Sequence, residues 1–177
     1  SVRRSGVLVV VLVSAVLAGC ASFSPDAGFS SIESAAKDKL GKDVRWARSD
    51  ADVDTIDRRA RELLAKPLSV DDAVQVALLN NRGLQARFQD LGITEAEVVQ
   101  AGRLPNPGFT FGRLRRGDEV ELERGLHLNL ARLLTLPMVS QMEARRFEQV
   151  KREVTMDMLS LAADARKAYF QAVAAEE

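Results

Sequence analysis

Residues 120–130, with the sequence VELERGLHLNL, alternate between apolar and polar side chains along almost their whole length. A period of two predicts a β-strand with one apolar and one polar face. The length also matches a tilted strand that crosses a membrane. A half-buried strand of a water-soluble antiparallel sheet alternates in the same way, so the pattern by itself leaves both interpretations open.

The two faces of this predicted strand carry different chemistry. The apolar face, which we expect to contact lipid, is interrupted only by Arg124 and consists of Val120, Leu122, Leu126, Leu128 and Leu130. The opposite face, which we expect to line a water-filled lumen, consists of Glu121, Glu123, His127 and Asn129.

The preceding residues predict a partner strand. Residues 108–114 place Phe109 and Phe111 on one face, and the polar residues 115–119 form a turn between the two strands. Two strands alone are not a stable sheet, so we expect further strands from other chains or from another part of the protein.

Long helices are predicted on both sides of this hairpin. The first covers residues 70–104, with Ser69 as its cap, a break expected near residues 80–83, and an end imposed by Pro105. The second covers residues 138–177, and in both helices apolar residues recur every three or four positions. No capping residue follows the second helix, so we expect the sequence to be truncated at its C-terminus. These elements predict a mainly α protein with a β-hairpin and coiled-coil-like helices.

The N-terminus predicts export and lipid attachment. Arg3 and Arg4 precede a short apolar run, too short to span a membrane and typical of a signal peptide over residues 1–19. The run ends in a sequence that resembles the bacterial lipobox, the recognition site of signal peptidase II, formed by Leu17, Ala18, Gly19 and Cys20. We therefore expect Cys20 to be acylated. Residues 20–66 are polar and mixed, which predicts a tether behind the lipid with one short helix.

Composition excludes several classes of function. The 25 basic residues balance the 25 acidic ones, which argues against a nucleic-acid partner. One cysteine and one histidine leave no basis for a disulfide framework or a Cys/His zinc site. His127 has no catalytic partner in a recognisable motif, so we predict no enzyme activity, no metal and no cofactor.

Three segments carry a resemblance to a known family. They are residues 68–81 (LSVDDAVQVALLNN), residues 100–107 (QAGRLPNP), and Ala168-Tyr169-Phe170 followed by Ala174-Ala175-Glu176. Their order and spacing resemble the first half of a TolC-family outer membrane efflux protein, with the lipobox fitting the lipoprotein branch. The resemblance covers about residues 67–177.

The resemblance implies a specific assembly. In this family three protomers each give four strands to one twelve-stranded barrel in the outer membrane, and their helices form a periplasmic tunnel. Such a trimer is a passive export duct for small molecules or metal ions. Its partners are a periplasmic adaptor protein and an inner-membrane pump of the resistance-nodulation-division type. The alternative is an outer membrane lipoprotein that acts as a coiled-coil scaffold without a channel.

Overall fold

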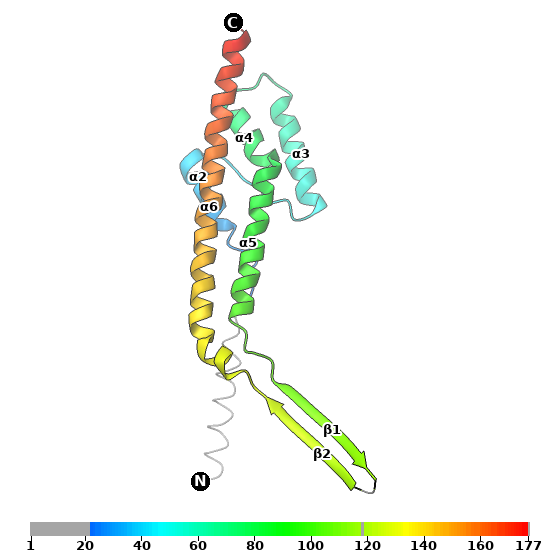
Figure 1. Ribbon diagram of the computed structural model, residues 1–177. Helices are drawn as coiled ribbons and strands as arrows, with labels where there is room; N and C mark the ends of the chain where they lie inside the picture. The colour runs from blue at the N-terminus through cyan, green and yellow to red at the C-terminus, as the bar shows by residue number, and fades with distance from the viewer. Residues whose placement is uncertain (1–21, 118, 177) are drawn as a thin grey trace, which may run out of the picture. The chain divides into compact units, whose positions relative to one another are not determined.

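The computed structural model describes residues 22–117 and 119–176. These residues are mainly helical and include a two-stranded antiparallel β-hairpin, as the sequence predicts (Figure 1). The chain divides into two compact units. Residues 97–144 form the hairpin unit, and residues 23–96 together with residues 145–177 form the helical unit.

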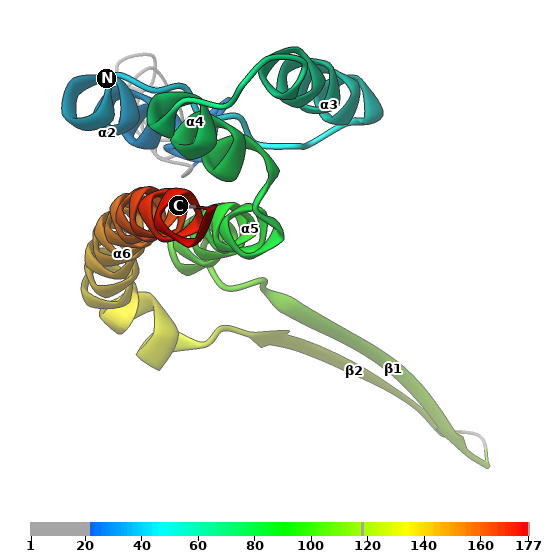
Figure 2. The same cartoon turned by 90° about the horizontal axis from the view of Figure 1, so that it is seen from above.

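The helical unit contains three short helices and the larger parts of two long ones. The short helices are α2 (Ser30–Leu40), α3 (Asp50–Leu64) and α4 (Val70–Asn80), and the long ones are α5 (Arg82–Ala101) and α6 (Leu130–Glu176). Seen from above, α2, α4 and α3 lie in one layer and α5 and α6 lie beside each other in a second layer (Figure 2).

A continuous hydrophobic core joins α2, α4, α5 and α6. The apolar spacing predicted it correctly at Val74, Leu84, Phe88 and Leu91, all of which are buried. Phe88 is fully buried and packs edge-on against Phe29, with ring centroids 4.9 Å apart. The fully buried residues that α6 contributes are Val154, Met158 and Ala162.

An arginine beside this core connects the two long helices. Arg87 of α5 donates from Nε to Asp157 of α6 at 2.6 Å and from its guanidinium to Asp90 at 2.7 Å. The hydrogen bond to Asp157 raises the pKa of Arg87, so the side chain remains a cation. The bonds fix the α5–α6 pairing on the side of α5 that faces solvent.

Serine side chains begin two of the helices. Ser49 Oγ accepts from the Asp52 amide, and Ser69 Oγ accepts from the Asp72 amide, as predicted for Ser69. Each serine hydroxyl also donates to the aspartate carboxylate at 2.8 Å. These serine hydrogen bonds are the main cause that lowers the pKa of both carboxyls.

The break predicted within residues 70–104 is confirmed, and the predicted end of the helix at residue 104 is wrong. Asn81 has extended backbone, with φ −75° and ψ 114°, and separates α4 from α5. Its Oδ1 accepts from the Leu84 amide at 2.9 Å, so the asparagine ends one helix and caps the next. The break lies within the expected region near residues 80–83, while α5 ends at Ala101 instead of residue 104.

The prediction of a tether over residues 20–66 is also wrong for the described part of that segment. Helix α2 buries Ile32 and Ala36 in the core, and the strand-like segment after it buries Val44 and Trp46. The apolar stripe of α2 has so few residues that the surrounding polar sequence predicts a tether in its place. The short helix predicted there corresponds to α3, whose buried residues are Ile56, Ala60 and Leu63.

The hairpin unit corrects three further boundaries. Strand β1 covers Gly108–Arg116 and strand β2 covers Glu119–His127, so the strands extend further toward the turn than predicted. Gly117 adopts a left-handed φ of 65°, which glycine tolerates and a tight turn requires.

Helix α6 begins at Leu130 and contains Pro137, whereas the sequence predicted a strand to residue 130 and a helix from residue 138. Asn129 explains the difference because its Oδ1 accepts from the Arg132 amide at 2.9 Å and starts the helix early. Pro137 lies inside α6 and removes one backbone donor from its hydrogen-bond ladder.

Candidate functional site

The register of the hairpin sorts its side chains onto two faces. Phe109 pairs with Leu126, and Phe111 pairs with Arg124. Residues directly opposite each other in an antiparallel pair share a face. What we call the apolar face therefore consists of Phe109, Phe111, Arg113, Arg115, Val120, Leu122, Arg124 and Leu126. What we call the acidic face consists of Gly108, Thr110, Gly112, Leu114, Arg116, Glu119, Glu121, Glu123, Gly125 and His127.

Large hydrophobic side chains on the apolar face are exposed. Phe109 is 77% exposed, Phe111 is 73% exposed and Leu126 is 60% exposed. A contiguous set of exposed aromatic and aliphatic side chains marks a surface that another molecule or a lipid phase covers. The hairpin therefore presents an interaction surface.

The acidic face is ordered by close contacts near its base. Thr110 Oγ1 lies 3.0 Å from His127 Nε2, a hydrogen-bonding distance. Gly125 makes room for this pair, because a Cβ atom at that position would lie 2.3 Å from Thr110 Oγ1. A glycine opposite a threonine thus keeps polar groups together on the side away from the phenylalanines.

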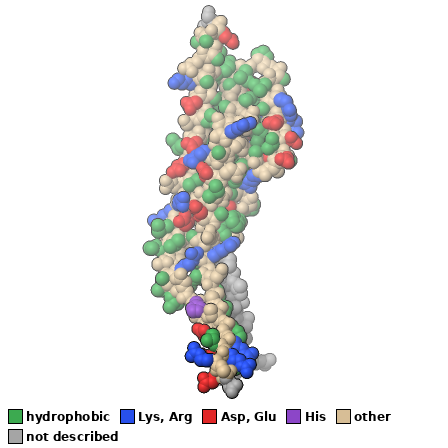
Figure 3. Space-filling view, turned by 45° about the vertical axis from the view of Figure 1, so that its right-hand side comes forward, with side chains coloured by type: hydrophobic (Ala, Val, Ile, Leu, Met, Phe, Trp, Pro, Cys, Tyr) green, Lys and Arg blue, Asp and Glu red, His purple; other side chains and the backbone are tan. Residues whose placement is uncertain are grey.

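Charged groups gather toward the tip of the hairpin. Figure 3 shows basic and acidic side chains side by side at the lower end of the molecule. In the register of the strands, all three described glutamates of the hairpin lie on the acidic face, where Arg116 pairs with Glu119. The other three arginines of the strands lie on the apolar face.

Exposed apolar residues continue beyond the strands within the hairpin unit. Leu128 and Leu130 follow β2 directly, and Leu134 in the first turns of α6 is 82% exposed. Other large exposed side chains of this part of α6 are Leu133, Met138 and Met142.

Several sequence-predicted site residues are grouped by the structure as expected. Val120, Leu122 and Leu126 lie on one face, and Glu121, Glu123 and His127 lie on the other. What each face contacts stays a prediction. Leu128, Asn129 and Leu130 are not strand residues, so their predicted placement on the strand faces is wrong.

The predicted lipidation site lies in a part of the chain that the structure does not describe. Leu17, Ala18, Gly19 and Cys20 lie outside the described residues. Sequence reasoning did not place Phe109 and Phe111 on the same face as Leu126, because that placement depends on the register of the two strands.

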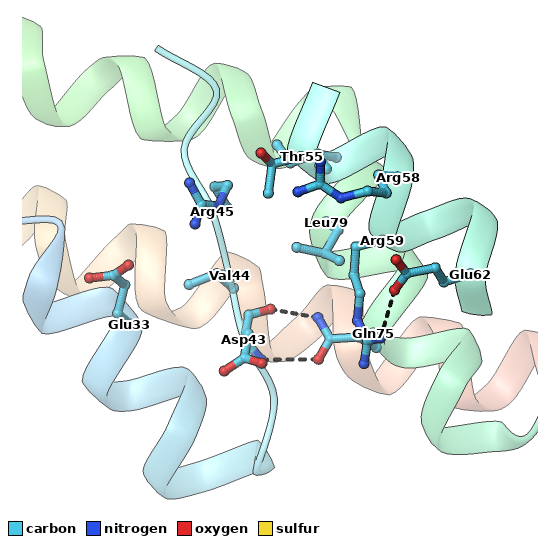
Figure 4. A pocket seen from close by; sticks show the side chains of 11 residues that line it. Glu33, Asp43, Val44, Arg45, Thr55, Arg58, Arg59, Glu62, Gln75 and Leu79 are labelled. Carbon is cyan, nitrogen blue, oxygen red and sulfur yellow. Dashed lines mark hydrogen bonds and ion pairs between the residues drawn. The ribbon is translucent and has the colours of Figure 1, made fainter. Parts of the chain in front are cut away.

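The helical unit also contains a depression, of about 440 Å³, between α3, α4 and the segment after α2 (Figure 4). Gln75 bonds the backbone of Asp43 twice, at 3.0 and 2.7 Å, and Arg59 pairs with Glu62 at 3.1 Å. The two Gln75 bonds thus join α4 to the segment after α2, whereas the Arg59–Glu62 pair lies within α3.

Membrane-spanning helices and metal-binding clusters are absent from the described residues. No helix among them combines the length and the apolar character needed to cross a membrane. Residues 22–117 and 119–176 hold no cluster of three or more histidine, cysteine or acidic side chains arranged to bind a metal ion.

No protein-family model, no curated protein and no solved structure matches the chain.

Proposed function

We propose that the chain is a component of an outer membrane channel in a tripartite efflux system, a passive export duct for small molecules or metal ions. In this proposal three copies assemble into the duct, and each hairpin supplies two strands of a shared barrel. A periplasmic adaptor protein and an inner-membrane pump of the resistance-nodulation-division type join it at the other end. No catalytic step is required.

The exposed two-faced hairpin is the observation that carries this proposal. Each strand has nine residues, a length of about 30 Å, or roughly 21 Å in height at a 45° tilt. That height approaches the roughly 25 Å apolar band of outer membrane barrels. An isolated hairpin with unpaired edges and an exposed apolar face needs neighbouring strands and lipid, both of which a barrel supplies.

The start of the described chain is bonded to helix α5. Ser24 donates to the buried carboxylate of Glu95 in α5 from both its amide and its hydroxyl. The predicted lipidation site at Cys20 precedes Ser24 by four residues, which span at most about 14 Å. A lipid on Cys20 would therefore hold this part of α5 close to a membrane surface, and α5 leads within a few residues into β1.

The length and surface of α6 agree with a duct. Its 47 residues give a helix of roughly 70 Å, long enough to reach well away from a membrane. Much of its later part is exposed, including Phe170 at 60%, which leaves surface for contacts with further helices.

The alternative is a coiled-coil scaffold lipoprotein. Such a protein would use the same lipid anchor and long helices, but it has no need for a strand pair with opposite apolar and acidic faces. The exposed phenylalanines of β1 therefore favour the channel.

Conductance tests the proposal. We expect the full-length gene product, acylated, extracted from outer membranes and added to a planar bilayer, to give discrete channel steps and to migrate as a trimer on an unheated gel. A scaffold protein would run on the gel but would give no channel steps in the bilayer, and that outcome would contradict the proposal. A matched sample with Phe109 and Phe111 changed to Ser should lose conductance while its helical content is unchanged.

A further inference from the structure

Arginines interrupt the apolar face of the hairpin, and no acidic residue of the described strands lies on that face. Arg113, Arg115 and Arg124 share this face with the phenylalanines and leucines, while Glu119, Glu121 and Glu123 all point to the other side. The two faces of this one sheet therefore differ in charge, with three arginines on the apolar face and three glutamates on the acidic face.

Neither Arg113 nor Arg124 forms an ion pair with any described residue, and Arg115 bonds only the carbonyl of Gly117, at 3.3 Å. In the helical unit, by contrast, Arg87 has three carboxylate partners. The cationic groups on the apolar face are thus left for an external anion.

The positions of these arginines along the strands indicate the depth at which that anion lies. Arg113 precedes the glycine of the turn by four residues, about 13 Å of strand, and Phe109 lies beyond it toward the base. An arginine on a lipid-facing strand is costly at the midplane of a bilayer and nearly free at its surface. The half of the face with Arg113 and Arg115 therefore fits the headgroup level, and the half with Phe109 and Leu126 fits the acyl chains, while Arg124 lies level with Phe111 between the two.

We propose that the apolar face binds anionic, phosphate-bearing membrane lipids, with Arg113 and Arg115 on the headgroup phosphates, Arg124 extending toward them from the level of Phe111, and Phe109, Phe111 and Leu126 along the acyl chains. Guanidinium groups form paired hydrogen bonds to phosphate oxygens, which makes arginine the suitable cation. A zwitterionic headgroup offers a weaker site because its own ammonium group balances the phosphate. This inference rests on the proposed membrane location of the hairpin.

Fluorescence quenching by brominated lipids tests the inference. Phe111→Trp places a reporter directly opposite Arg124, and the buried native Trp46 supplies a background that the unchanged protein measures. The acylated full chain is reconstituted in vesicles of brominated phosphatidylcholine or in mixtures with brominated phosphatidylglycerol. We expect phosphatidylglycerol to associate with the reporter site roughly fivefold more strongly, about the effect of one arginine at a charged surface.

Two variants make the result specific. Changing Arg113, Arg115 and Arg124 to Gln should bring the ratio of the two association constants to unity. Changing Glu119, Glu121 and Glu123 to Gln, a matched charge change on the acidic face, should leave the preference in place. Circular dichroism of both variants shows that the helices are retained.

The possible failures are distinguishable. Equal quenching by the two lipids, or a preference that survives the arginine changes, would overturn the lipid selectivity and leave the membrane location standing. Absence of quenching by either lipid would mean that the hairpin does not enter the bilayer, and it would overturn the proposed function together with this inference.

Discussion

The helical unit and the hairpin unit use similar residues in opposite ways. Phe88 of α5 is completely buried among side chains from several helices, whereas Phe111 of β1 is 73% exposed. The helical unit thus buries its large apolar side chains against one another, whereas the hairpin leaves its own exposed. Stability and function should respond differently to the same substitution in the two units.

The largest expected effect comes from the core. Phe88→Ala should lower the free energy of unfolding by about 3–5 kcal/mol, because it removes buried surface and leaves a cavity. The matched change Phe111→Ala should alter it by less than about 0.5 kcal/mol in detergent, since that ring has no packed neighbours to lose. Urea denaturation followed by circular dichroism measures both, and equal losses would contradict the contrast.

The next prediction concerns the face that we assign to lipid. Leu126→Arg should weaken membrane integration by about 2–4 kcal/mol if this residue lies near the midplane. Leu122→Arg, closer to the turn and beside the native arginines, should cost about 0–1 kcal/mol. Refolding into vesicles at a series of urea concentrations gives both values. A larger loss for Leu122→Arg would reverse the depth that we infer.

A smaller effect is expected where the N-terminal segment joins α5. Ser24→Ala removes the hydroxyl donor to Glu95 and should cost about 1 kcal/mol of stability. Glu95→Ala removes both bonds, so the double variant should be no less stable than Glu95→Ala alone. Additive losses in a double-mutant cycle would mean that the two residues are not coupled.

The helix caps give the smallest effect, and it depends on pH. Ser69→Ala should cost about 0.5–1 kcal/mol at neutral pH. The pKa of Asp72 is lower in the folded chain than in the unfolded chain, so its contribution is complete above about pH 4 and is lost as the pH falls further.

Thermal unfolding between neutral pH and pH 3 tests this sign. The unchanged protein should lose stability over that range by more than Ser69→Ala does, because the variant has already lost the main bond that lowers the pKa of Asp72. If both proteins lose the same stability between neutral pH and pH 3, the Ser69 hydrogen bond is not the cause of that loss.

The same contrast explains what could be read from the sequence. Residues 74–91 and 154–158 were assigned to a buried face correctly because a spacing of three and four is the direct signature of a packed helix. The alternation after Glu119 was equally informative for β2. In both segments the pattern and the structure have the same physical origin.

Errors arose where a single side chain decides the local backbone. Asn81 and Asn129 end or begin helices by accepting backbone hydrogen bonds, and nothing in the apolar spacing reports that. Helix α2 was missed because Ile32 and Ala36 form too short a stripe to register against a polar background. Contacts that depend on the register of two strands, such as Phe109 with Leu126, require the turn geometry as well as the pattern.

The central claim is that one face of the hairpin lies in lipid and the other in water. The variants Leu126→Cys and Glu123→Cys test it directly, because the two positions are three residues apart on β2 and point to opposite faces, and the unchanged chain, whose one cysteine is Cys20, supplies the background. Intact outer membranes carrying each variant are treated with a membrane-impermeant, water-soluble thiol reagent. We predict labelling of Glu123→Cys and protection of Leu126→Cys until detergent is added. Equal labelling of the two positions in membranes would contradict the claim.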